Sequence, residues 1–179
     1  MRNLNFQQLV EEVAKMRHRG RDGVPSCSSL KRLKDCKGSR KASKGIKSKD
    51  SSYSKAGNVE HYLQFLGYCP IDAPDEVYER YEIARHEVQK YLDEGWTILA
   101  KEEFLEITDV LTGTPDLVLV KDDNFQEFVV IDYKFGFEIV EAMDQMAGYA
   151  HLLFERYDRA KKVCTHIVQP QFNQHSPME

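Results

Sequence analysis

Long apolar runs are absent from this sequence of 179 residues. None approaches the roughly 18 consecutive apolar residues that a helix needs to cross a bilayer. The N-terminus also lacks the short apolar core of a secretory signal peptide. The sequence therefore predicts a protein without membrane association and with a cytoplasmic location.

Cysteine is scarce as well, and its spacing excludes some metal and redox sites. The four cysteines are Cys27, Cys36, Cys69 and Cys164. No two of them form the C-x-x-C pair that is typical of zinc sites and redox motifs. Four cysteines can in principle bind an iron–sulfur cluster. We instead expect reduced, mostly structural thiols, as is usual in the cytosol.

Length and composition favour one domain, because 179 residues with 41% hydrophobic side chains can bury a substantial core. The net charge of -4 hides a strong asymmetry. Residues 1–55 contain fifteen Lys or Arg and five Asp or Glu, whereas residues 56–179 contain ten and twenty-four. We therefore divide the chain into a basic, helical and partly flexible N-terminal region, 1–55, and an acidic core, 56–179.

The basic region is a candidate track for a nucleic-acid backbone, whose phosphates attract clustered Lys and Arg. Its candidate DNA-binding residues are Arg32, Arg40, Lys41, Lys44 and Lys47. The alternative is a solvated, disordered segment, since residues 37–55 are rich in Ser, Gly and Lys. The two interpretations agree if the segment becomes ordered on DNA.

Two acidic residues and a lysine near the middle of the chain carry the most chemistry. Asp116 ends the run Gly-Thr-Pro-Asp, and Asp132 and Lys134 lie in the run Ile-Asp-Tyr-Lys. The wholly apolar stretches 117–120 and 128–131 predict a hairpin with both arms buried. A carboxylate directly after such a stretch is costly to bury unless a cation neutralises it.

Mg²⁺ or Mn²⁺ is the cation that this residue set favours. Such an ion takes oxygen ligands, activates water and stabilises charge on a scissile phosphate. Side chains alternate along a strand, so Asp132 and Lys134 should share a face. A three-residue loop at 122–124 predicts a register in which Asp116 lies opposite Val130, on that same face. The alternative is an ordinary ion pair at a strand end, after a simple turn.

Together these motifs resemble the PD-(D/E)xK nuclease superfamily, and specifically its RecB-like and lambda-exonuclease-like branch. The segments that carry the resemblance are GTPDLVLV at 113–120, EFVVIDYKFG at 127–136 and DQMAGYAHLL at 144–153. Within the branch the chain is most similar to an uncharacterised phage-associated group, and the resemblance covers roughly Ser26 to Pro170. The cysteines depart from branch members that carry an iron–sulfur cluster, which use one early and three late cysteines.

The resemblance implies a role for each central residue. It implies that Asp116 and Asp132 are metal ligands and that both take part in catalysis. Lys134 corresponds to the catalytic lysine. Asp132 stands where relatives often have Glu, which is within the range that the superfamily tolerates.

Three further positions match the branch. His61, four residues after Gly57, resembles its metal-binding histidine. The alternatives are that Glu60 is the ligand, or that His61 only flanks an apolar stripe. Gln145 and Tyr149 share one helix face and match a Gln/Tyr pair of the branch. The resemblance implies that Gln145 orients the lysine or the substrate during catalysis and that Tyr149 contacts DNA. The alternative is a polar edge beside a core stripe.

Hydrophobic periodicity predicts helices first, then a meander of strands, a crossover helix and a last strand. Helices are expected at 4–17, 28–36, 55–66, from 72 or 75 to 92, and at 138–157. Strands are expected at 96–107, 113–120, 126–135 and 163–168. The predicted fold class is α/β with a restriction-endonuclease-like core. Its mixed four-stranded sheet is an antiparallel meander plus a last strand, flanked by helices.

The resemblance predicts a deoxyribonuclease that depends on Mg²⁺ or Mn²⁺. We expect an exonuclease that hydrolyses phosphodiester bonds at DNA ends in phage or bacterial recombination or repair. DNA is the expected partner, a recombination or single-strand-binding protein is a further candidate, and an oligomer is compatible with the sequence. If phage-encoded, the chain would work in the cytoplasm of the bacterial host. The alternative is a catalytically inactive nucleic-acid-binding module, or a subunit of a recombination complex.

Overall fold

The two wholly apolar stretches form the centre of a sheet. The structure, a computed structural model, describes residues 4–15, 24–43, 52–172 and 174–178. In it β4 (Leu117–Val120) and β5 (Glu127–Tyr133) pair antiparallel, and every residue of the two strands except Glu127 is buried. Strands that read as continuous apolar runs need cover on both faces. Helices provide it here.

Three further strands complete a mixed five-stranded sheet in the order β1-β4-β5-β6-β7. β1 (Thr97–Lys101) pairs antiparallel with β4. β6 (Lys162–Gln169) runs parallel to β5 after a crossover helix. The short η2 (Pro170–Phe172) then leads into β7 (Gln174–Met178), which pairs antiparallel with β6. The predicted α/β class with its mixed sheet is confirmed, and β7 is an edge strand that periodicity did not predict.

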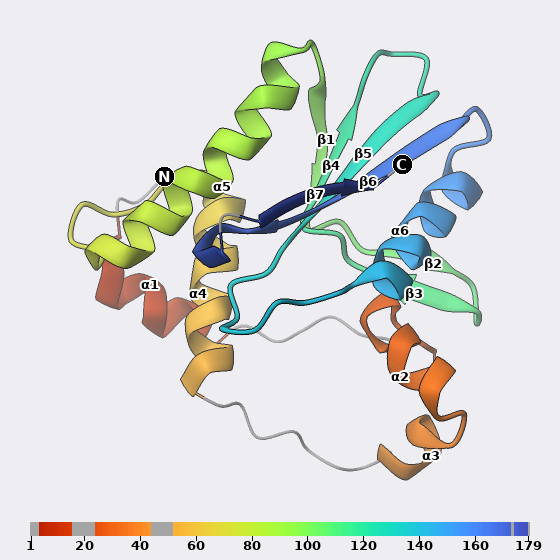
Figure 1. Ribbon diagram of the computed structural model, residues 1–179, viewed down its shortest axis with the longest axis horizontal. Coiled ribbons are helices and arrows are strands. Elements are labelled where there is room, and N and C mark those ends of the chain that lie inside the picture. The colour runs from red at the N-terminus through yellow and green to blue at the C-terminus, as the bar shows by residue number, and fades with distance from the viewer. Residues whose placement is uncertain (1–3, 16–23, 44–51, 173, 179) are drawn as a thin grey trace.

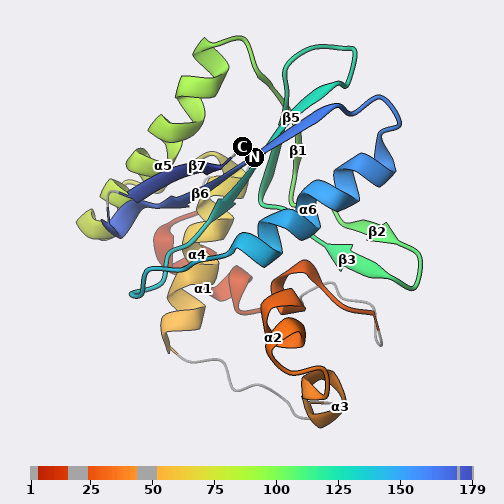
Figure 2. The ribbon, with the colours of Figure 1, turned by 45° about the vertical axis from the view of Figure 1, so that its right-hand side comes forward.

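Two helices cover opposite faces of the sheet (Figures 1 and 2). α5 (Asp75–Asp93) packs Ala84 and Val88 against one set of β4 and β5 side chains. α6 (Met143–Arg156) packs Met146 against the other set. Successive residues of the two central strands alternate between these cores, as a side-chain period of two requires.

A third apolar cluster anchors the helices that precede the sheet. α1 (Phe6–Val13) and α4 (Ser52–Leu66) pack against the first half of α5. The buried members of this cluster are Leu9, Leu63, Val77 and Tyr81. α4 is followed by Gly67, whose φ of +68° is a left-handed conformation that glycine adopts without strain. The packing brings His61 of α4 against the ends of the central strands.

The segment around Cys27 packs closely on α6. This layer consists of η1 (Cys27–Ser29), α2 (Leu30–Asp35), β2 (Leu105–Ile107) and β3 (Leu111–Gly113), and α3 (Ser39–Ser43) follows α2. A Cβ on Gly148 of α6 would lie 2.8 Å from Cys27 Sγ and 2.7 Å from Leu30 Cδ1. Burial raises the pKa of the Cys27 thiol to about 12. Cys27 is therefore a packing residue, and the other three cysteines are free as well.

Two predicted strands are interrupted beside the site. The strand expected at 96–107 divides into β1 and β2, because Glu102 adopts a left-handed backbone with φ of +46°. The strand expected at 113–120 divides into β3 and β4, with Pro115 in the break. Proline has no N–H to donate to a strand ladder. The two breaks are neighbours, since the Glu102 amide donates to the Asp116 carbonyl oxygen at 3.1 Å.

The crossover helix begins later than periodicity predicts. Residues 138–142, expected to be helical, form a loop, and α6 begins at Met143. The Gln169 side chain accepts a hydrogen bond of 3.2 Å from the Val140 amide and donates one of 3.2 Å to the Glu138 carbonyl oxygen. These bonds satisfy backbone groups that a helix would otherwise satisfy. The loop is thus fixed by a residue from β6, which local periodicity cannot reveal.

The hairpin register also differs from the predicted one. The β4–β5 ladder pairs Leu117 with Ile131, because the connecting loop is longer than the three residues expected. Continued by one residue, this register puts Asp116 opposite Asp132, so the predicted pairing with Val130 is wrong. The slip is by an even number of positions, which keeps the two acids on the same side of the hairpin.

The described helices bear on two further predictions. None of them is both long enough and apolar enough to pass through a membrane.

The expected division between residues 55 and 56 falls within α4, which runs without a break from Ser52 to Leu66. The change in charge along the chain therefore does not coincide with the end of an element.

Candidate active site

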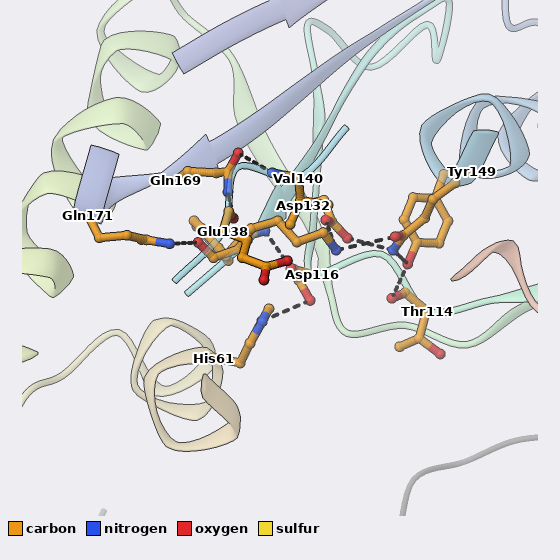
Figure 3. A network of polar contacts seen from close by, with 12 residues as sticks. His61, Thr114, Asp116, Asp132, Glu138, Val140, Tyr149, Gln169 and Gln171 are labelled. Atoms are coloured by element: carbon orange, nitrogen blue, oxygen red, sulfur yellow. Dashed lines mark hydrogen bonds and ion pairs between the residues drawn. The ribbon is translucent and has the colours of Figure 1, made fainter. Parts of the chain in front are cut away.

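The ends of β4 and β5 bring the two predicted acids together (Figure 3). Asp116 immediately precedes β4, and Asp132 is the penultimate residue of β5. Packed apolar strands therefore hold both backbones in place. α4 approaches the pair with His61, and α6 approaches it with Tyr149 (Figure 3).

Asp116 makes its contacts on the α4 side. Its Oδ1 lies 3.3 Å from His61 Nδ1, and its Oδ2 accepts a hydrogen bond of 2.6 Å from the Tyr133 amide. Burial acts to lower the pKa of His61, but the charge of Asp116, its hydrogen bond to the ring and the charge of Asp132 together raise that pKa above its ordinary value. The His61 ring also packs edge-on against Phe135, with ring centroids 5.1 Å apart. His61 is thus fixed in position facing Asp116.

Asp132 is the more enclosed acid, with 2% of its surface exposed. Its Oδ2 pairs with the Lys134 ammonium, and its Oδ1 accepts a hydrogen bond of 3.0 Å from Gln145 Nε2. Lys134 Nζ in turn donates to Gln145 Oε1 at 3.2 Å. Burial and the nearby charge of Asp116 raise the pKa of Asp132 above its usual range despite the lysine. The shared face predicted for Asp132 and Lys134 is confirmed.

Tyr149 continues the hydrogen bonds behind Asp132. Gln145 Nε2 donates to the Tyr149 hydroxyl oxygen at 2.9 Å, and this hydroxyl donates to the Thr114 carbonyl oxygen at 3.2 Å. Tyr149 is 4% exposed, and burial, followed by the charge of Asp132, raises the pKa of its hydroxyl. A side chain this buried has no surface to offer DNA. The predicted DNA contact of Tyr149 is therefore wrong, and the residue supports Gln145 instead.

Glu60 points away from the acids although it is adjacent to His61. Its two carboxylate oxygens accept hydrogen bonds of 2.8 Å from Arg80 of α5, in a bidentate pair. Neighbouring residues on a helix project about 100° apart, so only one of them can face the strand ends. Of the two candidate ligands, His61 is the one beside Asp116.

Two glutamines that sequence reasoning did not single out hold the segment after Lys134. Gln171 Nε2 donates to the carbonyl oxygens of Lys134, at 2.9 Å, and of Gly136. Gln169 fixes the loop that follows, and it is 3% exposed. The signal that could have found them is a pair of glutamines directly after an apolar strand, around Pro170. Their partners are evident only once β6 lies beside β5.

The donor types at the site fit a hard divalent cation. Two carboxylates and an imidazole are suitable ligands for Mg²⁺ or Mn²⁺, and the buried Asp132 Oδ2 receives no hydrogen bond of ordinary geometry from the described residues. Within the part of the chain that is described, no three His, Cys, Asp or Glu side chains are already grouped as a metal site. His61 engages Asp116, and Lys134 engages Asp132. The residues thus fit such a cation in chemistry, while ion pairs occupy their oxygens.

The predicted DNA-binding residues of the basic region are described only in part. Arg32 of α2 and Lys41 of α3 are exposed. Arg40 lies in α3, and Lys44 and Lys47 lie outside the described residues. α2 packs against α6, so its cations lie on the α6 side of the site (Figure 2).

No curated protein matches this chain. Three solved structures are similar to it at a distance. The first is the crystal structure of SSO0001, with 12% identity, 97% of this chain and 75% of that chain covered, and a TM-score of 0.35. The second is an alkaline exonuclease (LHK-Exo) from Laribacter hongkongensis, with 12% identity, coverage of 87% and 76%, and a TM-score of 0.38. The third is a phage related exonuclease from Haemophilus somnus 129PT, with 16% identity, coverage of 81% and 67%, and a TM-score of 0.35.

Likenesses this distant assign neither a function nor a residue role. A family model, in contrast, matches residues 71–179, which is more than half of the chain. The matched region includes both acids, Lys134 and the whole of the sheet. This chain belongs to the family described as "Protein of unknown function (DUF2800)".

Proposed function

We propose that this chain is a Mg²⁺- or Mn²⁺-dependent deoxyribonuclease, and specifically an exonuclease that acts at DNA ends in phage or bacterial recombination or repair. The observation that carries the proposal is the convergence of Asp116, Asp132 and Lys134 at adjacent strand ends. Two neighbouring carboxylates suit a divalent cation, and an ammonium beside them suits the negative charge of a phosphate.

In this proposal Asp116, Asp132 and His61 hold the cation, which when bound supplies an activated water and stabilises charge on the phosphate. The Lys134 ammonium is held between Asp132 and Gln145. It is therefore positioned to neutralise charge that develops on a phosphate oxygen. Gln145 is a positioning residue, because one amide binds both Lys134 and Asp132.

DNA is the proposed partner because of the basic segment that follows η1. Exposed cations on α2 and α3 can displace counterions from a phosphate backbone. A recombination or single-strand-binding protein as a second partner, and an oligomer, belong to the same proposal through the sequence resemblance alone.

The second candidate is a nucleic-acid-binding module without cleavage. It is favoured by the ion pairs of Asp116 with His61 and of Asp132 with Lys134, since both acids then serve the stability of the fold. The presence of two acids and a lysine in one cluster favours the nuclease.

Digestion of linear and covalently closed circular duplex DNA of the same sequence tests both candidates. We expect loss of the linear form alone, and only when Mg²⁺ or Mn²⁺ is added. Cleavage of the circle would indicate an endonuclease. Intact DNA in every lane, with DNA binding retained, would favour the binding module.

A further inference from the structure

A hollow beside Asp116 contains two cations from different elements. Arg85 of α5 and Lys101 of β1 line it, together with His61, Phe65, Asp116 and Tyr133. The hollow therefore borders the candidate active site on the α4 side, away from the basic residues of α2 and α3.

The two cationic groups converge on one point. A Cβ placed on Gly67 would lie 3.6 Å from Arg85 Nη1 and 3.7 Å from Lys101 Nζ. Burial, and then the positive charge of Arg85, lower the pKa of Lys101. None of the ion pairs within the described ranges involves either residue. Cations that converge in a hollow raise the local concentration of anions.

Two carboxylates also line the hollow and limit its positive charge. Asp116 contacts His61 and the Tyr133 amide, and Glu102 is exposed. Asp116 pairs with His61 rather than with Arg85 or Lys101, and Glu102 has a further contact of its own. The positive charge of the hollow is therefore concentrated beside Gly67, where the Arg85 and Lys101 side chains converge.

A bulge in β1 turns Lys101 into the hollow. The register of β1 on β4 shifts between Ile98 and Ala100. As a result Leu99 and Ala100 both pack into the core under α6, while Ile98 and Lys101 both line the hollow. In an uninterrupted strand, residues 98 and 101 would point to opposite faces. The bulge thus places an ammonium on this side of the sheet.

Helix capping accounts for only part of this arrangement. Lys101 Nζ donates to the Phe65 carbonyl oxygen at 3.1 Å, and cations stabilise a helix C-terminus. That contact uses one of the three N–H donors of the ammonium. The guanidinium of Arg85 brings five more donors to the same place. The arrangement supplies more donors than the end of α4 requires.

We propose that the hollow is a phosphate site in which Arg85 and Lys101 bind the phosphodiester group next to the one that is cleaved. A guanidinium binds two phosphate oxygens in parallel, and an ammonium adds a compact charge. Phe65 and Ile98, 40% and 45% exposed, offer apolar surface to the attached nucleoside. The identity of the ligand rests on the proposed nuclease function, whereas affinity for a phosphate group follows from the hollow itself.

Inorganic phosphate tests the site without DNA or metal. The measurement is an NMR titration of the full chain at constant ionic strength, read at the arginine Nε–H signals. Arg85 should shift with saturation, while Arg159, exposed between α6 and β6, should not. The amide signal of Gly67, which lies beside both cations, is the second readout. It should show a saturating shift that Arg85→Gln abolishes and Arg159→Gln preserves. Equal, non-saturating shifts at both arginines would overturn the proposal.

DNA binding in EDTA tests whether the bound phosphate belongs to the substrate. Arg85→Gln and Lys101→Gln should each lower the log–log slope of duplex affinity against salt by about 0.9, and Arg159→Gln should leave it unchanged. Saturable phosphate binding with unchanged slopes would overturn the assignment to the substrate strand.

Two further outcomes separate this site from its alternatives. Lower thermal stability in both variants, without any change in phosphate affinity or slope, would show that the two cations only cap α4. If both variants reduce the salt slope but the unmodified chain never cleaves DNA, the phosphate site would be supported and the proposed nuclease function contradicted.

Discussion

The two acids of the site have different surroundings although they lie at adjacent strand ends. Asp132 is enclosed on the α6 side, where Lys134 and Gln145 contact its two oxygens. The Asp116 side chain is 15% exposed, faces His61 and borders the hollow that contains Arg85 and Lys101. The enclosed side therefore fixes the geometry of the lysine, and the open side is where a ligand can enter.

The largest effect is expected on the enclosed side. Lys134→Ala removes the ammonium that is to stabilise charge on the phosphate, so the cleavage rate should fall by at least about a hundred-fold. Lys161→Ala is the matched control, since Lys161 is exposed at the far end of the sheet. Single-turnover cleavage and DNA affinity in EDTA should both be measured. Full activity of a folded Lys134→Ala protein would remove the lysine from the mechanism.

Substitution of Gln145 should have the second-largest effect on the cleavage rate. Gln145→Glu keeps the shape of the side chain but replaces its N–H donor with an acceptor beside Asp132, so cleavage should fall about ten- to a hundred-fold. Tyr149→Phe removes one hydroxyl and leaves the amide between Lys134 and Asp132, so its effect should be several-fold at most. A larger effect from Tyr149→Phe than from Gln145→Glu would contradict this order of contacts.

On the open side, two adjacent residues should separate metal response from stability. His61→Ala should raise the metal concentration for half-maximal cleavage by about ten-fold or more, because a ligand is lost. Glu60→Gln breaks the buried pair with Arg80, so it should lower the melting temperature and leave the metal dependence unchanged. The measurements are metal titrations of cleavage and thermal denaturation. An equal change of metal dependence in both variants would indicate a general loosening of α4.

Substitution of two glycines by alanine should give the smallest effects, which are changes of opposite sign in the free energy of unfolding. Gly148→Ala on the enclosed side should lower the free energy of unfolding by about 1–3 kcal/mol, because a Cβ there meets Cys27 and Leu30. Gly57→Ala in α4 should raise it by about 0.5–1 kcal/mol, because nothing lies within 4 Å of the added Cβ. Urea denaturation of both variants measures the difference. Destabilisation by Gly57→Ala would show that α4 packs differently from this structure.

The enclosed side could largely be predicted from the sequence. Strand alternation predicted the shared face of Asp132 and Lys134, and the family resemblance indicated that Gln145 orients the lysine or the substrate. The apolar runs around them also predicted the two central strands. Tyr149 was misjudged because spacing gives a direction but not burial: the same helix face that presents Gln145 places Tyr149 in the core.

The open side could not be predicted in the same way. Arg85 and Lys101 meet only because α5 and β1 lie beside α4, and because a bulge rotates the end of β1. Gln169 and Gln171 reach the segment after Lys134 only across the β5–β6 pairing. Contacts of this kind depend on tertiary packing, which hydrophobic periodicity does not encode.

The central claim is that Asp116 and Asp132 form a divalent-cation site. Its most direct test is a calorimetric titration of Mn²⁺ into the full chain without DNA. The unmodified chain should give a saturable heat. Asp116→Asn and Asp132→Asn should each lose it while remaining folded, and Asp158→Asn, at an exposed position, should retain it. A folded, unmodified chain without a saturable Mn²⁺ heat, or an unchanged heat in both site variants, would contradict the claim.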